Sequence, residues 1–267
     1  MNRIEARFQE LRERGETAFI PYITAGDPSL AQSEAIVLAL AEAGCDVIEL
    51  GVPFSDPVGD GPVIQEAAQR ALAGRVSLDG ILASIRHIRQ KSEVPILLFS
   101  YFNPIMAYGA EVFARDAADA GADGLLCVDL PPEEADKYKQ ALDAHGLCTV
   151  FLVAPTTSEA RLARIAEKCT GFIYYVSRLG VTGEQQELSA DLAEALAGIK
   201  RHTDKPVAVG FGISTPEQAA KVAGMAEGVV VGSALVRHIA QLGDTPGTAA
   251  QVGEFVRQLV QAAKSSL

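Results

Sequence analysis

The chain has 267 residues, 48% of which are hydrophobic, and its formal net charge is −11 at pH 7. This length and apolar content allow one α/β barrel or two smaller domains around a large core. The acidic balance argues against nucleic acid or a membrane as a partner, because both present negative charge, and an anionic substrate would need local hydrogen-bond donors.

Signals for export or membrane insertion are missing from the sequence pattern. Residues 1–8 are charged and contain no apolar core of a signal peptide, and no apolar run is long enough to span a bilayer. The four cysteines are far apart, without a Cys-x-x-Cys pair, at Cys45, Cys127, Cys148 and Cys169. Scattered cysteines are typical of buried, reduced thiols. We therefore expect a cytoplasmic protein.

Short apolar runs alternate with amphipathic segments along the chain, as in a parallel sheet covered by helices. The predicted strands are 19–24, 47–50, 96–100, 124–128, 148–153, 172–176, 207–210 and 228–231. The predicted helices are 4–13, 29–43, 62–73, 78–91, 110–120, 133–145, 158–168, 190–200, 215–223 and 248–264. Eight strands with intervening helices predict an α/β fold, a single (β/α)8 TIM barrel over residues 1–267 with an extra N-terminal helix.

An open, doubly wound sheet is the alternative fold. It predicts fewer strands and an early Gly-x-Gly-x-x-Gly turn, and the sequence has neither. The loops richest in proline and glycine follow the second, third and sixth predicted strands, where barrel enzymes carry their catalytic residues.

Two carboxylates near the second predicted strand are candidate acid/base residues. Glu49 ends an apolar strand, where a carboxylate is costly to bury without a partner or a function. Asp60 lies in the Pro- and Gly-rich loop that follows. Taken alone, Glu49 could be a structural carboxylate and Asp60 a turn residue before Gly61. Together, on the C-terminal side of one strand, they favour an acid/base pair.

Glycines after the last two strands predict a phosphate site. The segments 210–214 and 231–234 follow the seventh and eighth predicted strands and include Gly212, Gly232 and Ser233. Loops at these positions and a short helix N-terminus commonly bind phosphate in this fold. Each glycine alone could be an ordinary turn, but two such loops side by side favour phosphate.

The segment 177–184 is polar and glycine-rich, and it is either an ordinary long connection or a lid over the substrate. Other chemistries are disfavoured. The four histidines lack ligand spacing, so we expect no metal, and a Gly-x-Ser-x-Gly elbow is missing. Lys205 precedes a strand rather than following one, which argues against a Schiff-base aldolase.

The segment 49–62, read Glu-Leu-Gly-x-Pro-Phe-Ser-Asp-Pro-x-x-Asp-Gly-Pro, closely resembles the tryptophan synthase alpha subunit family. Further blocks resemble the same family, in the family's order, at 24–28, 101–105, 129–134, 154–157, 171–174, 177–183 and 210–214. The similarity covers most of the chain. It implies a lyase of tryptophan biosynthesis that cleaves indole-3-glycerol phosphate to indole and glyceraldehyde 3-phosphate, a retro-aldol step without a cofactor in this chain.

The resemblance also implies roles for individual residues. Glu49 would protonate indole C3 and take the proton of the glycerol hydroxyl, while Asp60 would accept the indole N1–H and stabilise the cationic ring. Thr182 matches a lid threonine that hydrogen-bonds Asp60. The remaining matches are the phosphate-binding positions Gly183, Gly212, Gly232 and Ser233, the active-site tyrosine Tyr174, and the indole-pocket residues Tyr22, Phe99 and Leu126.

Three positions depart from the family pattern. Tyr22 stands where many members have phenylalanine, Gly59 often reads as alanine, and Val128 replaces a residue that is commonly proline or alanine. None of them alters the proposed acid/base pair. Tyr22 bears on how the indole fits.

The family works as a complex with a beta subunit, which carries pyridoxal phosphate and receives the indole. For this chain the resemblance implies a heterotetramer of two alpha and two beta subunits, with the loops around Asp56 and Asn103 facing the partner. A stand-alone indole-releasing lyase is one alternative. A non-catalytic phosphate-binding module that only regulates the partner is another, and the presence of both carboxylates argues against it.

Overall fold

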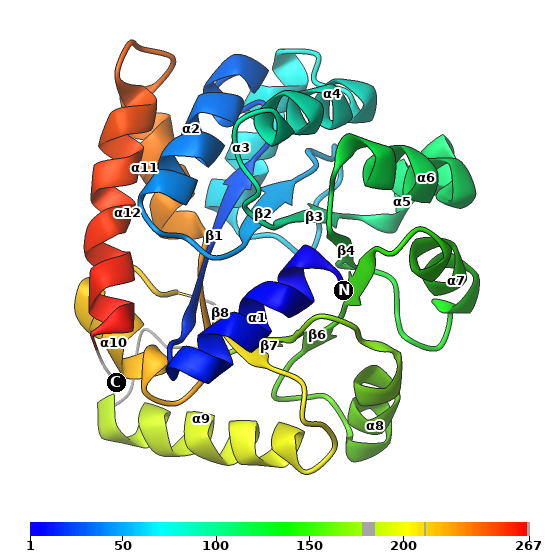
Figure 1. Ribbon diagram of the computed structural model, residues 1–267, viewed down its shortest axis with the longest axis vertical. Coiled ribbons are helices and arrows are strands. Elements are labelled where there is room, and N and C mark those ends of the chain that lie inside the picture. The colour runs from blue at the N-terminus through cyan, green and yellow to red at the C-terminus, as the bar shows by residue number, and fades with distance from the viewer. Residues whose placement is uncertain (178–184, 211, 266–267) are drawn as a thin grey trace.

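A computed structural model describes residues 1–177, 185–210 and 212–265, and for residues 185–190 it describes the backbone alone. Within these ranges the strands form one parallel sheet in the order β5-β4-β3-β2-β1-β9-β8-β7-β6. The strands are β1 (Ala18–Thr24), β2 (Ile48–Gly51), β3 (Ile96–Ser100), β4 (Gly124–Cys127), β5 (Cys148–Val150), β6 (Leu152–Val153), β7 (Ile173–Val176), β8 (Val207–Gly210) and β9 (Gly228–Val231). Figure 1 shows their arrangement.

The sheet curls into a barrel whose two edges are joined by the chain itself. The edge strands β5 and β6 are consecutive in sequence, with Phe151 alone between them. The Phe151 carbonyl accepts a hydrogen bond from the Tyr174 amide at 3.1 Å, so the sheet continues across this residue. The predicted single strand 148–153 therefore corresponds to β5 and β6 together, and the predicted (β/α)8 barrel is confirmed.

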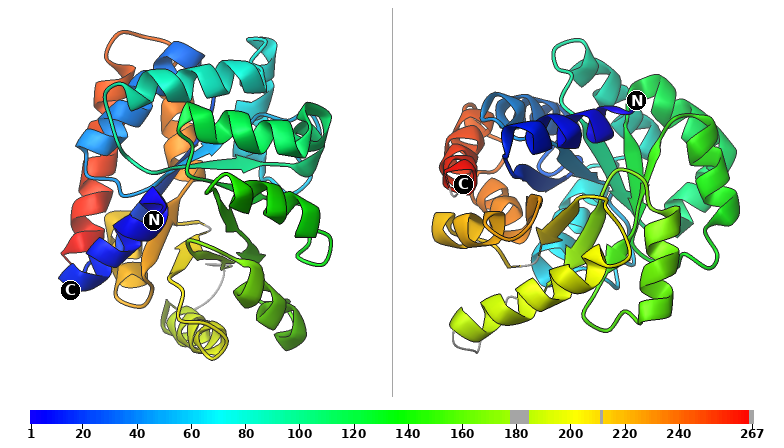
Figure 2. Two further views of the ribbon diagram at one scale, coloured as in Figure 1. Left: turned by 45° about the vertical axis from the view of Figure 1, so that its right-hand side comes forward. Right: turned by 60° about the horizontal axis from the view of Figure 1, so that its bottom comes forward.

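Helices cover the outside of the barrel, as the two views in Figure 2 show. The helices of the described ranges are α1 (Arg3–Arg14), which lies at one end of the barrel, and α2 (Leu30–Glu42), α3 (Pro62–Ala73), α4 (Leu78–Arg89), α5 (Phe102–Tyr108), α6 (Ala110–Ala120), α7 (Asp136–Ala144), α8 (Glu159–Lys168), α9 (Gln185–Lys200), α10 (Pro216–Ala223), α11 (Ser233–Leu242) and α12 (Thr248–Lys264). All ten predicted helices are present, and α5 and α11 are additional. Across the described ranges, none of the helices combines the length and apolar character that crossing a membrane requires.

The extra N-terminal helix closes one end of the barrel. Asn2 caps α1, because its side chain accepts a hydrogen bond from the Ile4 amide and its own backbone amide donates to Glu5. The buried face of α1, formed by Ile4, Phe8 and Leu11, packs against residues inside the barrel. In Figure 1 this helix lies across the barrel end that faces the viewer. The opposite end of the barrel, at the C-terminal ends of the strands, is not covered by α1 and can hold a binding site.

Alternation along the strands decides which side chains fill the barrel. The inner core, which we define as the cluster that α1 covers, takes every second strand residue. Its strand members include Ile20, Leu97, Leu126 and Val230, with Val47 just before β2 and Phe172 just before β7. Continuing the alternation by one step places Glu49 directly above Val47, in an otherwise apolar interior.

Candidate active site

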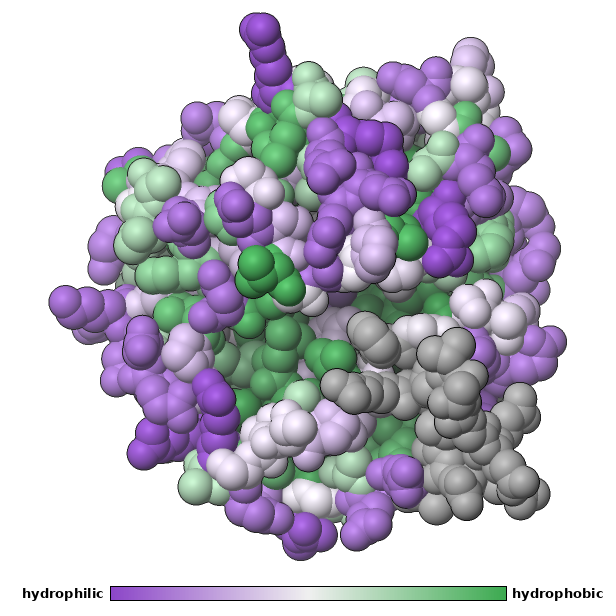
Figure 3. All heavy atoms as spheres, turned by 180° about the vertical axis from the view of Figure 1, so that it is seen from behind, coloured by the Kyte–Doolittle hydropathy of each residue, from purple (hydrophilic) through white to green (hydrophobic). Residues whose placement is uncertain are grey.

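A cavity of about 260 Å³ lies at the C-terminal ends of the strands. Side chains and glycines from opposite sides of the barrel line it: Tyr22, Glu49, Gly59, Asp60, Gly61, Ile64, Phe99, Val128, Leu152, Tyr174, Val176, Gly212, Val230, Gly232 and Ser233. Figure 3, seen from the side opposite to α1, shows a hollow with apolar residues in the middle of this face. The cavity is therefore mainly apolar, with two carboxyl groups in its wall.

Glu49 is held in this wall by β2. It pairs in register with Tyr22 on β1 and Leu97 on β3, and its exposed fraction is 0%. Within the described ranges, neither carboxyl oxygen has a hydrogen-bond partner. Burial raises the pKa of Glu49 well above its ordinary value, because a low-dielectric surrounding disfavours the charged form. The protonated form of this carboxyl is therefore favoured.

Asp60 is supplied by the loop between β2 and α3. Its side chain is half-buried, and its pKa is raised overall, because the effect of burial exceeds the opposing effect of the Tyr101 hydroxyl. The Asp60 carbonyl accepts a hydrogen bond from Gln65 Nε2 at 2.8 Å, in the first turn of α3. Both carboxyl groups thus line one cavity, Glu49 on a rigid strand and Asp60 on a loop.

Aromatic rings pack into space that two strand glycines leave open. Tyr22 meets Phe99 edge to face, with ring centroids 5.2 Å apart at 78°. A Cβ at Gly51 would overlap the Tyr22 hydroxyl and lie 2.6 Å from its Cζ. A Cβ at Gly210 would likewise overlap the hydroxyl of Tyr174 and lie 2.9 Å from its Cζ. The glycines at these inward positions are required by the rings that lie against them.

The opposite wall has the features of an anion site. Helix α11 begins at Ser233, immediately after Gly232, and both residues line the cavity. In the described part of the chain no side chain caps this helix, so its first backbone N–H groups are available to a ligand. Gly212 faces the same cavity from the loop after β8, with a positive φ of 81° that favours glycine. Local amides thus offer donors in a protein of net negative charge.

Most predicted site residues line the cavity. They are Glu49, Asp60, Tyr22, Phe99, Tyr174, Gly212, Gly232 and Ser233. Leu126 is not among the lining residues and lies fully buried in the inner core, beside Phe99 and Val128. Thr182 and Gly183 lie outside the described residues, as does most of the predicted lid.

Val128, Leu152 and Tyr101 were not predicted as site residues, although Val128 and Leu152 line the cavity and Tyr101 contacts the Asp60 loop. Val128 is two residues beyond Leu126, so alternation along the strand places it one layer nearer the cavity mouth. That signal was present in the sequence. Tyr101 gave no such signal, because its relation to the Asp60 loop depends on how two loops from neighbouring strands meet.

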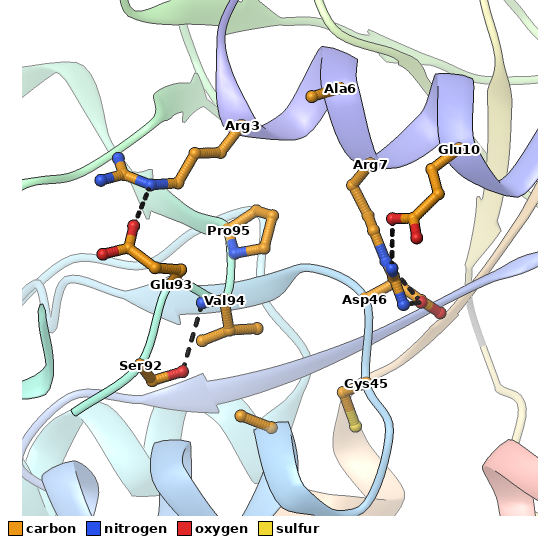
Figure 4. A pocket seen from close by; sticks show the side chains of 11 residues that line it. Arg3, Ala6, Arg7, Glu10, Cys45, Asp46, Ser92, Glu93, Val94 and Pro95 are labelled. Carbon is orange, nitrogen blue, oxygen red and sulfur yellow. Dashed lines mark hydrogen bonds and ion pairs between the residues drawn. The ribbon is translucent and has the colours of Figure 1, made fainter.

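A second pocket, of about 470 Å³, lies at the other end of the barrel beside α1. Figure 4 shows that its cationic side chains already face acidic ones: Arg7 reaches Asp46 at 2.7 Å and Arg3 reaches Glu93 at 2.7 Å. These pairs attach α1 to the barrel and leave no free charge for a ligand. Among the residues described, no group of three His, Cys, Asp or Glu side chains is placed to bind a metal ion.

Comparison with known proteins gives a consistent result. A family model described as "Tryptophan synthase alpha chain" matches residues 8–264. The chain is 52% identical over 261 residues to a protein named tryptophan synthase alpha chain from Citrifermentans bemidjiense, covering 98% of this chain and 97% of that one. It is 48% identical over 267 residues to the protein of that name from Geobacter sulfurreducens, covering 100% and 99%.

Solved structures agree with the sequence comparison. The structure titled tryptophan synthase subunit alpha from Legionella pneumophila str. Paris has a TM-score of 0.91 at 39% identity and covers 99% of each chain. A chain in a structure of tryptophan synthase from M. tuberculosis, in an aminoacrylate-bound form, has a TM-score of 0.88 at 36% identity, with 98% of this chain and 100% of that one covered.

Proposed function

The chain belongs to the tryptophan synthase alpha chain family, and on that premise we propose that Glu49 and Asp60 carry out its reaction. The protein is a carbon–carbon lyase of tryptophan biosynthesis, which cleaves indole-3-glycerol phosphate to indole and glyceraldehyde 3-phosphate. The observation that carries the assignment of Glu49 is its complete burial at the cavity wall with, in the described residues, no hydrogen-bond partner.

Glu49 acts first as the acid. Its raised pKa keeps the carboxyl protonated before the reaction, and it donates this proton to C3 of the indole ring. The carboxylate then takes the proton of the glycerol hydroxyl beside the scissile bond. The electron pair of that O–H bond becomes part of the aldehyde C=O, the carbon–carbon bond breaks, and its electron pair restores the aromatic indole. Glu49 ends the cycle protonated, as it began.

Asp60 stabilises the intermediate between these two proton transfers. Protonation at C3 leaves a positive charge on the indole ring, which makes the ring an acceptor for the electrons of the breaking bond. The ionised carboxylate of Asp60 accepts a hydrogen bond from indole N1–H and offsets this charge. Its partial burial supports the role, because a charge near a water-poor cavity interacts more strongly than one in bulk water.

The phosphate group of the substrate occupies the opposite wall. Backbone amides at Gly212, Gly232 and Ser233 are its expected donors, aided by the N-terminus of α11. Tyr22, Phe99 and Tyr174 enclose the indole, with Leu126 supporting them from below. Thr182 as a partner of Asp60, and Gly183 as a phosphate ligand, stay predictions from the family resemblance.

The family implies a beta subunit as partner, while its alpha chains work without a cofactor of their own. We propose a complex of two alpha and two beta subunits in which the beta subunit carries pyridoxal phosphate and receives the indole. Two features support docking over the loop after β2 and over α5, which follows β3: the side chains of Val58 and Met106 there are 87% and 58% exposed. Organisation as one domain and a cytoplasmic location stay predictions.

Substitution of the two carboxylates tests the proposal. Glu49→Gln keeps the shape of the side chain but cannot cycle a proton, so turnover should fall by about 10²–10⁴-fold. Asp60→Asn should lower kcat more than it raises KM, because Asp60 acts mainly on charge that develops during the reaction. Turnover is measured as indole release, with circular dichroism as the check on folding.

Surface substitutions of the same kind are the controls. Glu111→Gln and Asp119→Asn change exposed residues of α6 and should leave indole release unchanged. Residual activity of Glu49→Gln above about one per cent of wild type would contradict its assignment as the general acid. A rise in KM alone for Asp60→Asn would make Asp60 a binding residue.

A further inference from the structure

The loop that carries Asp60 is attached to the barrel through Tyr101. The Gly59 amide donates a hydrogen bond to the Tyr101 hydroxyl at 2.9 Å, and the ring of Phe54 packs on that of Tyr101 with centroids 5.3 Å apart. The same hydroxyl is close enough to the Asp60 carboxyl to affect its pKa. Tyr101 itself is 3% exposed and directly follows β3, so it is a fixed point for the loop.

Gly59 has little room for a side chain. A Cβ built there would lie 3.1 Å from the Tyr101 hydroxyl oxygen and 3.1 Å from Cγ1 of Val128. Both separations are shorter than ordinary van der Waals contact. The φ angle of Gly59 lies outside the left-handed region, so alanine could adopt this backbone without strain. With Tyr101 and Val128 in place, glycine is therefore favoured here by the space available and not by its backbone conformation.

Val128 fills the space that Gly59 leaves. It continues the inward-facing row of β4 above Leu126 and lines the cavity. Its β-branched side chain has few rotamers and cannot easily turn away. The absent side chain at position 59 and the bulk at position 128 are thus complementary across the gap between loop and barrel.

We propose that Gly59, Val128 and Tyr101 form a size match that sets how closely the Asp60 loop approaches the barrel, and that this distance aims the Asp60 carboxylate at the substrate. Gly59 and Tyr101 are positioning residues, since they act through Asp60. The proposal rests on the catalytic role proposed for Asp60 above. Displacement of a catalytic group by a fraction of an ångström to 1 Å is enough to lower turnover severalfold or more.

A double-mutant cycle tests the size match. Gly59→Ala should lower kcat for indole release by about tenfold and leave KM within about twofold, because the loop moves outward while the substrate pocket persists. Val128→Ala alone should act mainly on KM, since it enlarges the cavity. The double variant Gly59→Ala/Val128→Ala should regain at least about threefold in kcat over Gly59→Ala, because the smaller side chain returns the space.

Tyr101→Phe tests the attachment without changing bulk. Loss of the hydroxyl frees the Gly59 amide, so hydrogen exchange of peptides covering residues 53–61 should become faster. It also removes the interaction that lowers the pKa of Asp60, so the acid limb of the kcat/KM profile should move to higher pH. If Tyr101 only stabilised the fold, Tyr101→Phe would not speed hydrogen exchange selectively in this loop, and it would not shift the pH profile of kcat/KM.

Controls separate the possible failures. Gly198→Ala on α9 has ordinary spacing, with Arg201 Nη2 at 3.6 Å from the new Cβ, and reports what a glycine-to-alanine change does to the unfolded chain.

Asp60→Asn is measured in parallel. If it keeps wild-type kcat, the role of Asp60 and the proposal fall together. If it is inactive while Gly59→Ala keeps wild-type kcat, or if the double variant regains nothing, the size match alone is overturned. Tyr101→Phe with unchanged loop exchange overturns the attachment, even if Gly59→Ala fails to fold.

Discussion

Glu49 is 0% exposed in an apolar barrel, and burying a carboxyl there costs free energy. Its proposed role as a proton donor explains why it is nevertheless buried. Glu49 stands one step above Val47 on the inward face of β2, where its neighbours in register are Tyr22 and Leu97. In the part of the chain described, its carboxyl oxygens lack hydrogen-bond partners, so charge there is strongly disfavoured. The neutral acid is the tolerated form, and it is the form that the first proton transfer needs.

The preference of buried Glu49 for the neutral form should appear in how the free energy of unfolding depends on pH. The pKa of Glu49 is higher in the folded chain than the ordinary value of 4.5. Below that value the carboxyl is protonated in both states. Above it the unfolded chain loses the proton and the folded chain keeps it, so the free energy of unfolding falls by about 1.4 kcal/mol per pH unit until the folded-state pKa is passed.

Glu49→Gln has no proton to lose at this site. Its advantage in the free energy of unfolding over the wild type should therefore grow as pH rises from about 4.5. Urea denaturation at several pH values measures the difference, and the exposed Glu111→Gln serves as the control. A difference that is the same at every pH would mean that Glu49 titrates alike in the folded and unfolded chain.

Tyr22 stands where many family members have phenylalanine, and the structure shows the surroundings of its hydroxyl. Its side chain is 8% exposed, and its hydroxyl lies 3.4 Å from Thr24 Oγ1, pressed against Gly51. A contact of this length is a weak hydrogen bond.

Tyr22→Phe should therefore leave turnover within about threefold of wild type, because the ring supplies the apolar contact and the hydroxyl contributes little. Steady-state indole release is the measurement. Gly51→Ala is the contrasting variant, since its Cβ would press on the same ring and should lower activity sharply. A loss of tenfold or more in Tyr22→Phe would assign the hydroxyl a catalytic role.

At the scale of elements, the apolar runs predicted every strand, three of them (96–100, 207–210 and 228–231) with the same bounds that the structure has. Helices α5 and α11 were not predicted. Pro104 lies in the first turn of α5, where proline is tolerated, whereas the segment around Asn103 was expected to be a loop. The start of α11 was interpreted as part of a phosphate loop, although Leu235, Val236 and Ile239 form a buried helical face.

The site was predictable where it follows from strand position and alternation, as for Glu49 and Phe99. It was not predictable where it depends on contacts between loops, as for Tyr101 and Gly59. Leu126 shows the intermediate case. Its inward direction was implied by alternation, but its depth was not, because that depends on the tilt of the strands and on where the cavity floor lies.

The N-terminus of α11 makes the phosphate assignment testable. Ser233→Asp places a negative charge where the phosphate is expected and should abolish binding of glycerol 3-phosphate, measured by calorimetry. Ser233→Asn introduces a side chain of nearly the same shape as aspartate but without its charge, and it should retain most of the affinity for glycerol 3-phosphate. If Ser233→Asp binds as well as the wild type, the phosphate site lies elsewhere.

At the scale of the whole molecule, the two ends of the barrel have different tasks. The α1 end is sealed by the apolar face of the helix and by ion pairs such as Arg7 with Asp46, whose side chain is 0% exposed. The opposite end holds the cavity and the exposed side chains of Val58 and Met106. Stability and catalysis are thus assigned to opposite faces, as is usual for this fold.

We expect the isolated chain to be a poor catalyst that a beta subunit activates. Asp60 lies on the loop between β2 and α3, outside any helix or strand, and a partner docked over this loop and over α5 can favour the catalytic conformation by binding it better. A bias of about 1.4 kcal/mol gives tenfold in rate. Indole release with and without the beta subunit is the measurement. Equal rates would indicate the stand-alone lyase.

The pairing of β1 with β9 has a consequence for biosynthesis. One partner strand begins at Ala18 and the other at Gly228, so most of the chain must leave the ribosome before the ring can close. At 5–20 residues per second this takes tens of seconds. During that time the β1 edge and the apolar face of α1 lack their final covers. The nascent chain is therefore the form of this protein most exposed to aggregation and most in need of chaperones.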